Sequence, residues 1–316
     1  MIKKRHFFIV ISVFIVGLII GSINNIDLQI NQALFSKNNP FGLAMASFAV
    51  YPCYAGLAFI SGGLFSTTLK RKELPLYAKI LSYFLAGLAY IMAVYLGGGE
   101  LPSTNGFYNS SNPFWYWMLS YLLASFVFAG VAVWAFFVCK KGDAKKLWVV
   151  LLVMATIFVV GLLPPGFIIK LIIHRPRYRY LVRSGYLGFH NWWESVKNYK
   201  DYCAGDFVIE GFVIDKEEFK SFPSGHTGTA AMMMMFLPYA SFFFDKLKGK
   251  ELILFYVGFA WTLLMAFSRI LVGAHYLTDV CMGGLIITVV FFAVHLFATK
   301  KGWIYTEVKN DIQSKE

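Results

Sequence analysis

Runs of about 20 apolar residues recur along the sequence, and this feature limits the possible folds more than any other. One helix of that length crosses a bilayer whose hydrocarbon core is about 30 Å thick. Only 15% of the 316 residues are charged, whereas soluble domains carry about 25%. We therefore expect an all-α, polytopic transmembrane helical bundle. About eight spans are predicted, at residues 7–24, 42–67, 77–98, 114–138, 147–170, 225–244, 252–271 and 277–298.

The basic residues fall in every second segment between these spans, which is the pattern that orientation in a membrane requires. They cluster near the N-terminus, in three connecting segments and after residue 299, so both termini are predicted to be cytoplasmic. The intervening segments 25–41 and 99–113 are nearly uncharged. Because orientation accounts for the net charge of +12, we expect no nucleic-acid partner. The first apolar run is long and lacks a convincing cleavage site, which favours a retained span over a signal peptide.

Polar and ionisable residues gather in three segments that this topology places at the extracytoplasmic face. Such residues are costly at the ends of spans unless they reach water or serve a function. The segments are Lys170 with the following "LIIHRPRYR", then "PSGH" from residue 223, and "SRILVGAHYLTD" from residue 268. The candidate site residues within them are Lys170, Arg175, Arg177, Ser224, Gly225, His226, Arg269, His275 and Asp279.

The cations of this set suit a phosphate group. Arginine presents a planar fork to phosphate oxygens, while lysine acts as a point charge. Lys170 and Arg177 are two helical turns apart and would share one face if the helix continued, although Pro176 disfavours that continuation. No carboxylate cluster is available for a divalent metal, and the four cysteines are too scattered to indicate a metal site or a disulfide framework. We therefore expect no metal and no cofactor.

The remaining residues supply the reactive groups. Ser224 is a predicted N-cap, and Gly225 allows the backbone to approach a ligand closely, so the helix start forms an anion site beside His226. His275 and Asp279 have the i, i+4 spacing of neighbours on one helix face. An aspartate that orients one imidazole nitrogen leaves the other free as a nucleophile. Two histidines of this kind predict phosphoryl transfer through a phosphohistidine, with one attacking and the other transferring a proton.

Other polar residues are given a structural interpretation. A single histidine in a span is more often packed or interfacial than catalytic, and His6, His190 and His295 are interpreted in this way. Arg179 and Arg183 are expected to be anchors that reach toward the membrane surface. The aromatic residues of the long connection 171–224, such as Trp192 and Trp193, fit an interfacial aromatic belt as well as a functional role.

At this point the sequence resembles the type 2 phosphatidic acid phosphatase superfamily, the integral-membrane lipid phosphate phosphatases. That family carries the motifs Lys-x6-Arg-Pro, Pro-Ser-Gly-His and Ser-Arg-x5-His-x3-Asp. The second and third are met in full, from Pro223 to His226 and from Ser268 to Asp279. In the first motif Tyr178 stands where proline is expected. We favour Arg177 as its arginine and keep Arg175 as an auxiliary contact.

The resemblance implies a role for each matching residue. It makes His275 the nucleophile, Asp279 the residue that orients it, and His226 the acid that protonates the leaving oxygen. It assigns the phosphoryl oxygens to Lys170, Arg177, Ser224, Gly225 and Arg269. Many members have six spans, so the two extra spans predicted here would precede the first motif.

The expected function is hydrolysis of a lipid phosphate or diphosphate at the extracytoplasmic face of a cell membrane. Polyprenyl diphosphate, phosphatidate and phosphatidylglycerophosphate are candidate substrates. A phosphotransferase with the same chemistry, and a non-catalytic protein that binds or transports lipid phosphates, are the alternatives. We divide the chain into an N-terminal transmembrane region of about four spans (1–146), a catalytic core (147–299) that contains the external loop 171–224, and a cytoplasmic tail (300–316).

Overall fold

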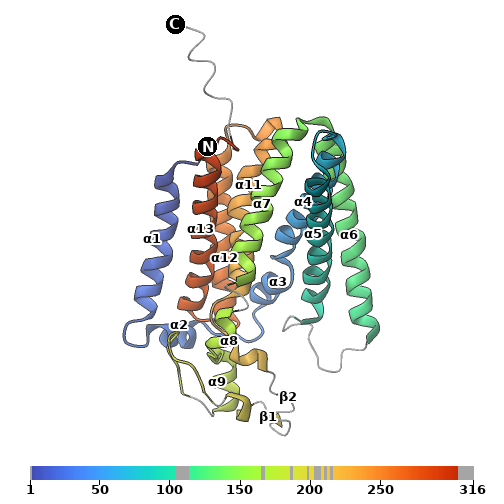
Figure 1. Cartoon of the computed structure of the whole chain (residues 1–316). Coiled ribbons are helices and arrows are strands. Elements are labelled where there is room, and N and C mark those ends of the chain that lie inside the picture. Colours follow the sequence, from blue (N-terminus) through green and yellow to red (C-terminus); the bar gives the residue numbers. More distant parts are fainter. Residues whose placement is uncertain are drawn as a thin grey trace.

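The structure is a computed structural model that describes residues 2–103, 114–164, 168–185, 188–197, 199–202, 208–209, 212–213 and 216–304. Long, roughly parallel helices make up most of it (Figure 1). The all-α, polytopic prediction is confirmed, and seven helical segments of the described chain are long and apolar enough to cross a membrane. The long helices are α1 (Lys4–Gly21), α4 (Tyr51–Lys70), α5 (Leu76–Ser103), α6 (Phe114–Lys141), α7 (Ala144–Pro164), α12 (Glu251–Leu271) and α13 (Leu277–Lys300).

Short elements join the long helices. Two short helices, α2 and α3, follow α1, and the remainder lie between α7 and α12. They are α2 (Ile26–Leu34), α3 (Pro40–Phe48), α8 (Lys170–Ile172), α9 (Tyr178–Ser184), α10 (Gly225–Ala231) and α11 (Met233–Tyr239). A hairpin of β1 (Val208–Ile209) and β2 (Phe212–Val213), with 3-10 turns at Tyr199–Tyr202, Lys216–Phe219, Ala240–Phe242 and Asp245–Leu247, completes the described chain.

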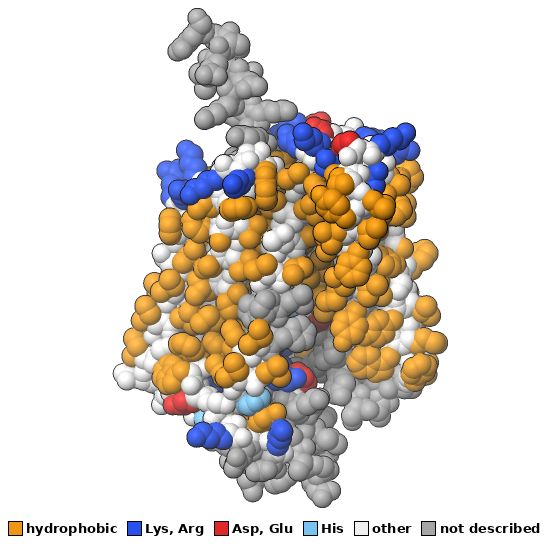
Figure 2. Space-filling view, viewed as in Figure 1, with side chains coloured by type: hydrophobic (Ala, Val, Ile, Leu, Met, Phe, Trp, Pro, Cys, Tyr) orange, Lys and Arg blue, Asp and Glu red, His pale blue; other side chains and the backbone are white. Residues whose placement is uncertain are grey.

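The outer surface of the bundle is apolar, as a lipid-facing surface must be. Large side chains such as Phe114 and Phe126 are each 81% exposed. Figure 2 shows hydrophobic side chains along the visible face of the bundle and a row of Lys and Arg at one end, where α1 begins and α13 ends (Figure 1). The predicted basic segments of the described chain therefore share one end, and the opposite end carries α2, α8 and α9 (Figure 1).

Two groups of helices meet within the bundle. In one, α4 packs against α5, α6 and α7; in the other, α13 packs against α1, α7 and α10. Helix α12 contacts α10 and α11, and α7 contacts both groups. Small residues allow the closest approaches: a Cβ atom at Gly62 of α4 would lie 1.9 Å from the carbonyl oxygen of Ala132 in α6. The interior of the bundle is therefore formed by both the N-terminal and the C-terminal halves of the chain.

The predicted span 225–244 is not one continuous helix. It consists of α10 and α11, which are separated at Met232. The N–H of Met232 bonds to the carbonyl of Thr229, a tighter i to i−3 pattern than that of an α-helix. Helix α12 approaches closely at this break, because a Cβ atom at Gly258 would lie 2.5 Å from the backbone nitrogen of Met234. This interruption explains why seven long helices stand where about eight spans are expected.

The described parts of the long connection 171–224 lie at the end of the bundle opposite the basic segments (Figure 1). Trp192 and Trp193 of this connection differ in their contacts and in their exposure to solvent. The Nε1 of Trp192 donates to Ser22 Oγ at 3.0 Å, and the Trp192 ring stacks on Phe222. Trp193 is 52% exposed. Trp192 therefore fastens the connection to the end of α1, and only Trp193 has the exposure that an interfacial belt requires.

Candidate active site

The Pro-Ser-Gly-His segment forms the start of α10. Ser224 is the N-cap, as predicted, and its Oγ accepts a hydrogen bond from the N–H of Thr227 at 3.3 Å. The N–H of Ser224 donates to the carbonyl oxygen of Asp279 at 3.0 Å. A Cβ atom at Gly283 would lie 2.4 Å from the Ser224 carbonyl oxygen, so α13 and this turn touch through their backbones. The helix start is thereby fixed against the helix that carries Asp279.

His275 lies in the turn between α12 and α13 and precedes the first residue of α13. The prediction that His275 and Asp279 share one helix face is therefore wrong. The ring Nδ1 of His275 bonds to the carbonyl oxygen of Ser221 at 2.6 Å and lies 3.7 Å from Asp279 Oδ2. A carbonyl only accepts, so Nδ1 carries the proton and Nε2 keeps its lone pair. Burial lowers the pKa of His275 well below its ordinary value, which leaves the ring neutral at neutral pH.

The carboxylate of Asp279 is buried and accepts several hydrogen bonds. The donors are the N–H of Tyr276 at 2.9 Å, the hydroxyl of Ser221 at 2.5 Å and Nη1 of Arg175 at 2.5 Å. Ser221 thus contacts both Asp279, through its hydroxyl, and His275, through its carbonyl. A carboxylate held by such donors stays ionised, so a fixed negative charge lies beside the His275 ring.

The guanidinium of Arg175 is buried in the protein, where it contacts Asp27 and Asp279. Its Nη2 donates to Asp27 Oδ2 at 2.9 Å, its Nε donates to the carbonyl of His190 at 2.9 Å, and its side chain has no exposed area. The guanidinium also lies 4.0 Å from the ring centre of Tyr276. The auxiliary phosphate contact expected of Arg175 is thus replaced by a contact with the carboxylate that neighbours His275.

Three other cations surround the turn of residues 223–226, called the phosphate turn below. Lys170 begins α8, Arg177 is the N-cap residue of α9, and Arg269 lies in the last turn of α12, where it is 2% exposed. The helix does not continue from Lys170 to Arg177, because it ends at Ile172 and resumes after Arg177. Burial, with the nearby charge of Arg177 as the second cause, lowers the pKa of Lys170 to about 8. Burial also lowers the pKa of Arg177, to about 10.

Several nitrogen donors of these arginines have no hydrogen-bond partner within the described chain. They are Nε of Arg177 and both Nε and Nη1 of Arg269. Buried donors in native structures are almost always satisfied, so unpaired guanidinium nitrogens indicate a position for an acceptor. Nη1 of Arg179 is unpaired as well, but Nε and Nη2 of Arg179 form a two-contact ion pair with Glu218 at 2.9 and 2.5 Å. Arg179 is only 5% exposed, so its interpretation as a membrane-surface anchor is wrong.

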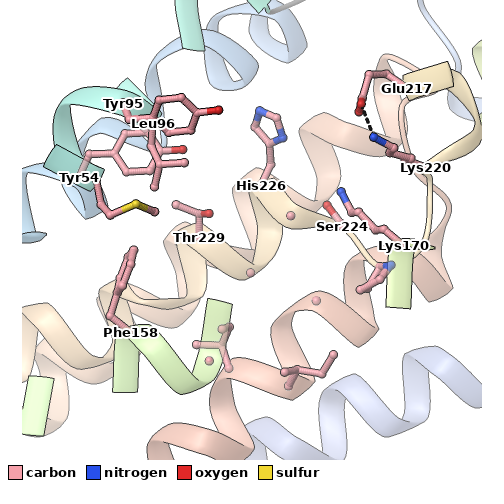
Figure 3. A pocket seen from close by; sticks show the side chains of 18 of the residues that line it. Tyr54, Tyr95, Leu96, Phe158, Lys170, Glu217, Lys220, Ser224, His226 and Thr229 are labelled. Atoms are coloured by element: carbon pink, nitrogen blue, oxygen red, sulfur yellow. Dashed lines mark hydrogen bonds and ion pairs between the residues drawn. The ribbon is translucent and has the colours of Figure 1, made fainter. Parts of the chain in front are cut away.

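A cavity of about 410 Å³ opens beside the turn and has two chemically different ends. In Figure 3, Lys170, Lys220 and Ser224 lie on one side of His226, and Leu96 and Phe158 lie on the other. Lys220 is paired with Glu217 at 2.5 Å. The apolar end is lined by Met92 and Leu96 of α5, Phe158 of α7, and Ile286 and Ile287 of α13. The cavity thus matches a ligand with an anionic head and an apolar chain.

His226 has a partner that the sequence did not reveal. Its Nε2 lies 2.7 Å from Oε1 of Glu100, a residue near the end of α5. The hydroxyl of Tyr54 donates to the other carboxylate oxygen, Oε2, at 3.2 Å. Glu100 is only 9% exposed. A carboxylate therefore stands beside each of the two histidines, Glu100 beside His226 and Asp279 beside His275.

The two carboxylates that the predicted site lacks, Glu100 and Asp27, lie in the nearly uncharged segments 99–113 and 25–41. Glu100 is the only acidic residue of 99–113, and Asp27 is the only one of 25–41. Asp27 accepts from the N–H of Thr278 at 3.0 Å in addition to its bond with Arg175. A lone carboxylate at the end of an apolar span is itself a signal, because it is costly there without a partner. That signal could have marked both residues.

The geometry agrees with a comparison against protein families. A family model described as the PAP2 superfamily matches residues 145–303, about half of the chain. The chain belongs to the PAP2 superfamily. Members of this superfamily are generally phosphatases. No curated protein and no solved structure was found to match the chain.

The PAP2 match begins at the start of α7 and ends just beyond α13. It therefore contains both histidines, Asp279 and the three cations around the phosphate turn. Asp27 and Glu100 precede it, although both contact its residues. In the described chain, no three His, Cys, Asp or Glu side chains are grouped as a metal ion would need. The positive charge at the turn is supplied by Lys170, Arg177 and Arg269.

Proposed function

We propose that this PAP2 protein is a phosphatase that hydrolyses a membrane lipid phosphate or diphosphate at the extracytoplasmic face, through a phosphohistidine intermediate. One observation carries this proposal above the others. The start of α10 and His226 lie at the junction between a cationic and an apolar part of one cavity (Figure 3). A lipid phosphate has the same division, and its scissile bond lies where the two parts join.

The first step transfers the phosphoryl group to His275. Its Nε2 lone pair attacks phosphorus, a nitrogen–phosphorus bond forms, and the bond from phosphorus to the leaving oxygen breaks. His226 gives a proton to that oxygen, so the lipid leaves as an alcohol, or as a monophosphate from a diphosphate. Positive charge develops on the His275 ring, where the nearby carboxylate of Asp279 stabilises it.

The second step releases phosphate. A water molecule attacks phosphorus while His226, now neutral, accepts one of its protons. The nitrogen–phosphorus bond breaks and its electron pair returns to Nε2 of His275. The sum of the two steps is one water consumed and one phosphate and one alcohol or monophosphate formed.

The cations act on the phosphoryl oxygens in both steps. The unpaired donors of Arg177 and Arg269 would bind the phosphoryl oxygens, together with Lys170 at the cavity wall. Preorganised donors of this kind stabilise charge that develops in the transition state. The backbone N–H groups at the start of α10 add to them, because the first N–H groups of a helix have no partner within it.

The test is phosphate release by the purified, detergent-solubilised protein from a panel of lipid phosphates and diphosphates. We expect release to persist in excess EDTA, because the cations of the site provide the positive charge, and to be inhibited by vanadate. Loss of activity in EDTA that magnesium restores would contradict a metal-independent reaction. Binding of lipid phosphates without any turnover would favour the binding or transport alternative. Transfer to an added alcohol in preference to water would favour the phosphotransferase.

A further inference from the structure

Glu100 reaches the cavity from a part of the chain that the PAP2 match does not include. It belongs to α5, and 126 positions separate it from His226. Its side chain is 11% exposed and that of His226 is 26% exposed, so water screens their contact little. The contact of 2.7 Å between Glu100 Oε1 and His226 Nε2 is short enough for a charge-assisted hydrogen bond.

The surroundings of His226 are otherwise cationic. The groups that face it from the neighbouring elements, or line the same cavity, are Tyr54, Glu100, Lys170, Arg177, Glu217, Lys220 and Arg269. Burial lowers the pKa of His226, the charges of Arg269 and Arg177 lower it further, and the contact with Glu100 opposes them by favouring a proton on the ring. Of the two glutamates, Glu217 is paired with Lys220. Glu100 is therefore the carboxylate that contacts the imidazole.

Tyr54 fixes the direction of this carboxylate. Its hydroxyl donates to Oε2 at 3.2 Å, while Oε1 faces the imidazole. Tyr54 itself lines the cavity and belongs to α4. Helices α4 and α5, which both precede the residues matched by the PAP2 model, thus hold the carboxylate of Glu100 against His226.

We propose that Glu100 is a positioning residue of the reaction: it accepts a hydrogen bond from Nε2 of His226 and stabilises the protonated ring that serves as the acid. This inference rests on the proposed function. With Nε2–H directed at Glu100, Nδ1 is the nitrogen that gives its proton to the leaving oxygen. The ring becomes neutral in that step and regains the proton at Nδ1 from the attacking water. Glu100 remains a carboxylate throughout and exchanges no proton.

The test compares Glu100→Gln with the wild type on two substrates of different leaving group, p-nitrophenyl phosphate and an alkyl lipid phosphate. Glutamine keeps the shape of glutamate but removes its charge. A positioned acid contributes about 100-fold or more to a reaction whose leaving group needs protonation. We expect kcat on the alkyl phosphate to fall at least about 10-fold, and kcat on the aryl phosphate to change less than about 3-fold.

The pH profile gives a second readout that a merely structural role would not move. The alkaline limb of kcat reports the acid in the enzyme–substrate complex. In Glu100→Gln this limb should move to lower pH, because the protonated ring loses its counter-charge. Glu194→Gln is the matched control, since Glu194 is an exposed carboxylate that contacts Asn191. It should keep the wild-type profile on both substrates.

Equal losses on the two substrates, or an unchanged alkaline limb in Glu100→Gln, would overturn the inference and leave the proposed function standing. If Glu100→Gln does not fold, Tyr54→Phe carries the test, because it frees one oxygen of the carboxylate and leaves its charge. Tyr54→Phe should also lose more kcat on the alkyl phosphate than on the aryl phosphate, although the loss should be smaller than in Glu100→Gln. Equal losses on the two substrates would count against the role of Glu100. If the wild-type protein is inactive on both substrates, both the proposed reaction and the proposed role of Glu100 are contradicted.

Discussion

Arg175 and Asp27 form an ion pair that is almost completely removed from solvent. Nη2 of Arg175 lies 2.9 Å from Oδ2 of Asp27, and the two side chains are 0% and 1% exposed. Through Nη1 the same guanidinium contacts Asp279 at 2.5 Å. Helix α2, which precedes the PAP2 match, is in this way connected to the carboxylate beside His275.

Replacing Arg175 by Met should destabilise the protein strongly, because it leaves the buried carboxylates of Asp27 and Asp279 without their shared cation. Removing one partner of a buried ion pair costs about 3–5 kcal/mol. The measurement is thermal unfolding in detergent. In the double variant Arg175→Met with Asp27→Asn, part of the loss should be recovered, since one of the unpaired charges is gone. Strictly additive losses in the double variant would show that the two side chains are not coupled.

The two histidines should differ in their dependence on the leaving group. His275→Ala removes the nucleophile and should abolish turnover of every substrate, while binding of a phosphate analogue survives. His226→Ala should retain activity on aryl phosphates, whose leaving groups need little protonation, and lose about 100-fold or more on alkyl phosphates. Single-turnover phosphate release measures both. Near-wild-type activity in His275→Ala would contradict the phosphohistidine route.

The affinity for substrate should fall above pH 8. Burial lowers the pKa of Lys170 to about 8, so the ammonium group loses its proton as pH rises through this value. A neutral amine attracts phosphate less, and kcat/KM should decrease on the alkaline side. Lys170→Arg should move this decrease to higher pH, because the guanidinium stays protonated. The control is Lys197→Arg at an exposed position, and a decrease that Lys170→Arg fails to move would have another origin.

The orientation in the membrane can be tested with introduced cysteines. Cys203, the native cysteine expected in the external loop, lies outside the described residues, so it is best replaced by Ser. The native cysteines 53, 139 and 281 are buried. Cysteines at the exposed positions Lys197 and Lys141 then report on opposite ends of the bundle. In intact cells, a membrane-impermeant maleimide should label position 197 and spare 141, and the reverse pattern would invert the proposed topology.

Patterns of neighbouring residues in the sequence predict most of the fold and part of the candidate site. Apolar runs predicted most of the long helices within a few residues, because the side chains of a lipid-facing helix are apolar over consecutive positions. The predicted span 42–67 covers both α3 and α4, and the predicted span 147–170 ends six residues beyond α7. The break at Met232 was missed, since it depends on the close approach of α12 at Gly258. No pattern within residues 225–244 contains that information.

The candidate site was predictable where its residues belong to short motifs. The motifs predict His226, His275 and Asp279, and the structure brings all three to the same end of α10 and α13. The contacts of Arg175 with Asp27 and of His226 with Glu100 join residues 148 and 126 positions apart. Each of these carboxylates is a single acidic residue in its segment, so only tertiary packing defines its partner.

The two-ended cavity has a consequence for how the products depart. On the proposed reaction, one product is a free anion and the other is a lipid, and the cavity presents cations toward one end and apolar side chains toward the other (Figure 3). Phosphate would leave past Lys170 and Lys220 toward water, while the lipid product would withdraw between α5, α7 and α13 into the bilayer. On this view the two products would leave from different ends of the cavity. Accumulated lipid product should therefore slow the entry of the next substrate without slowing the escape of phosphate.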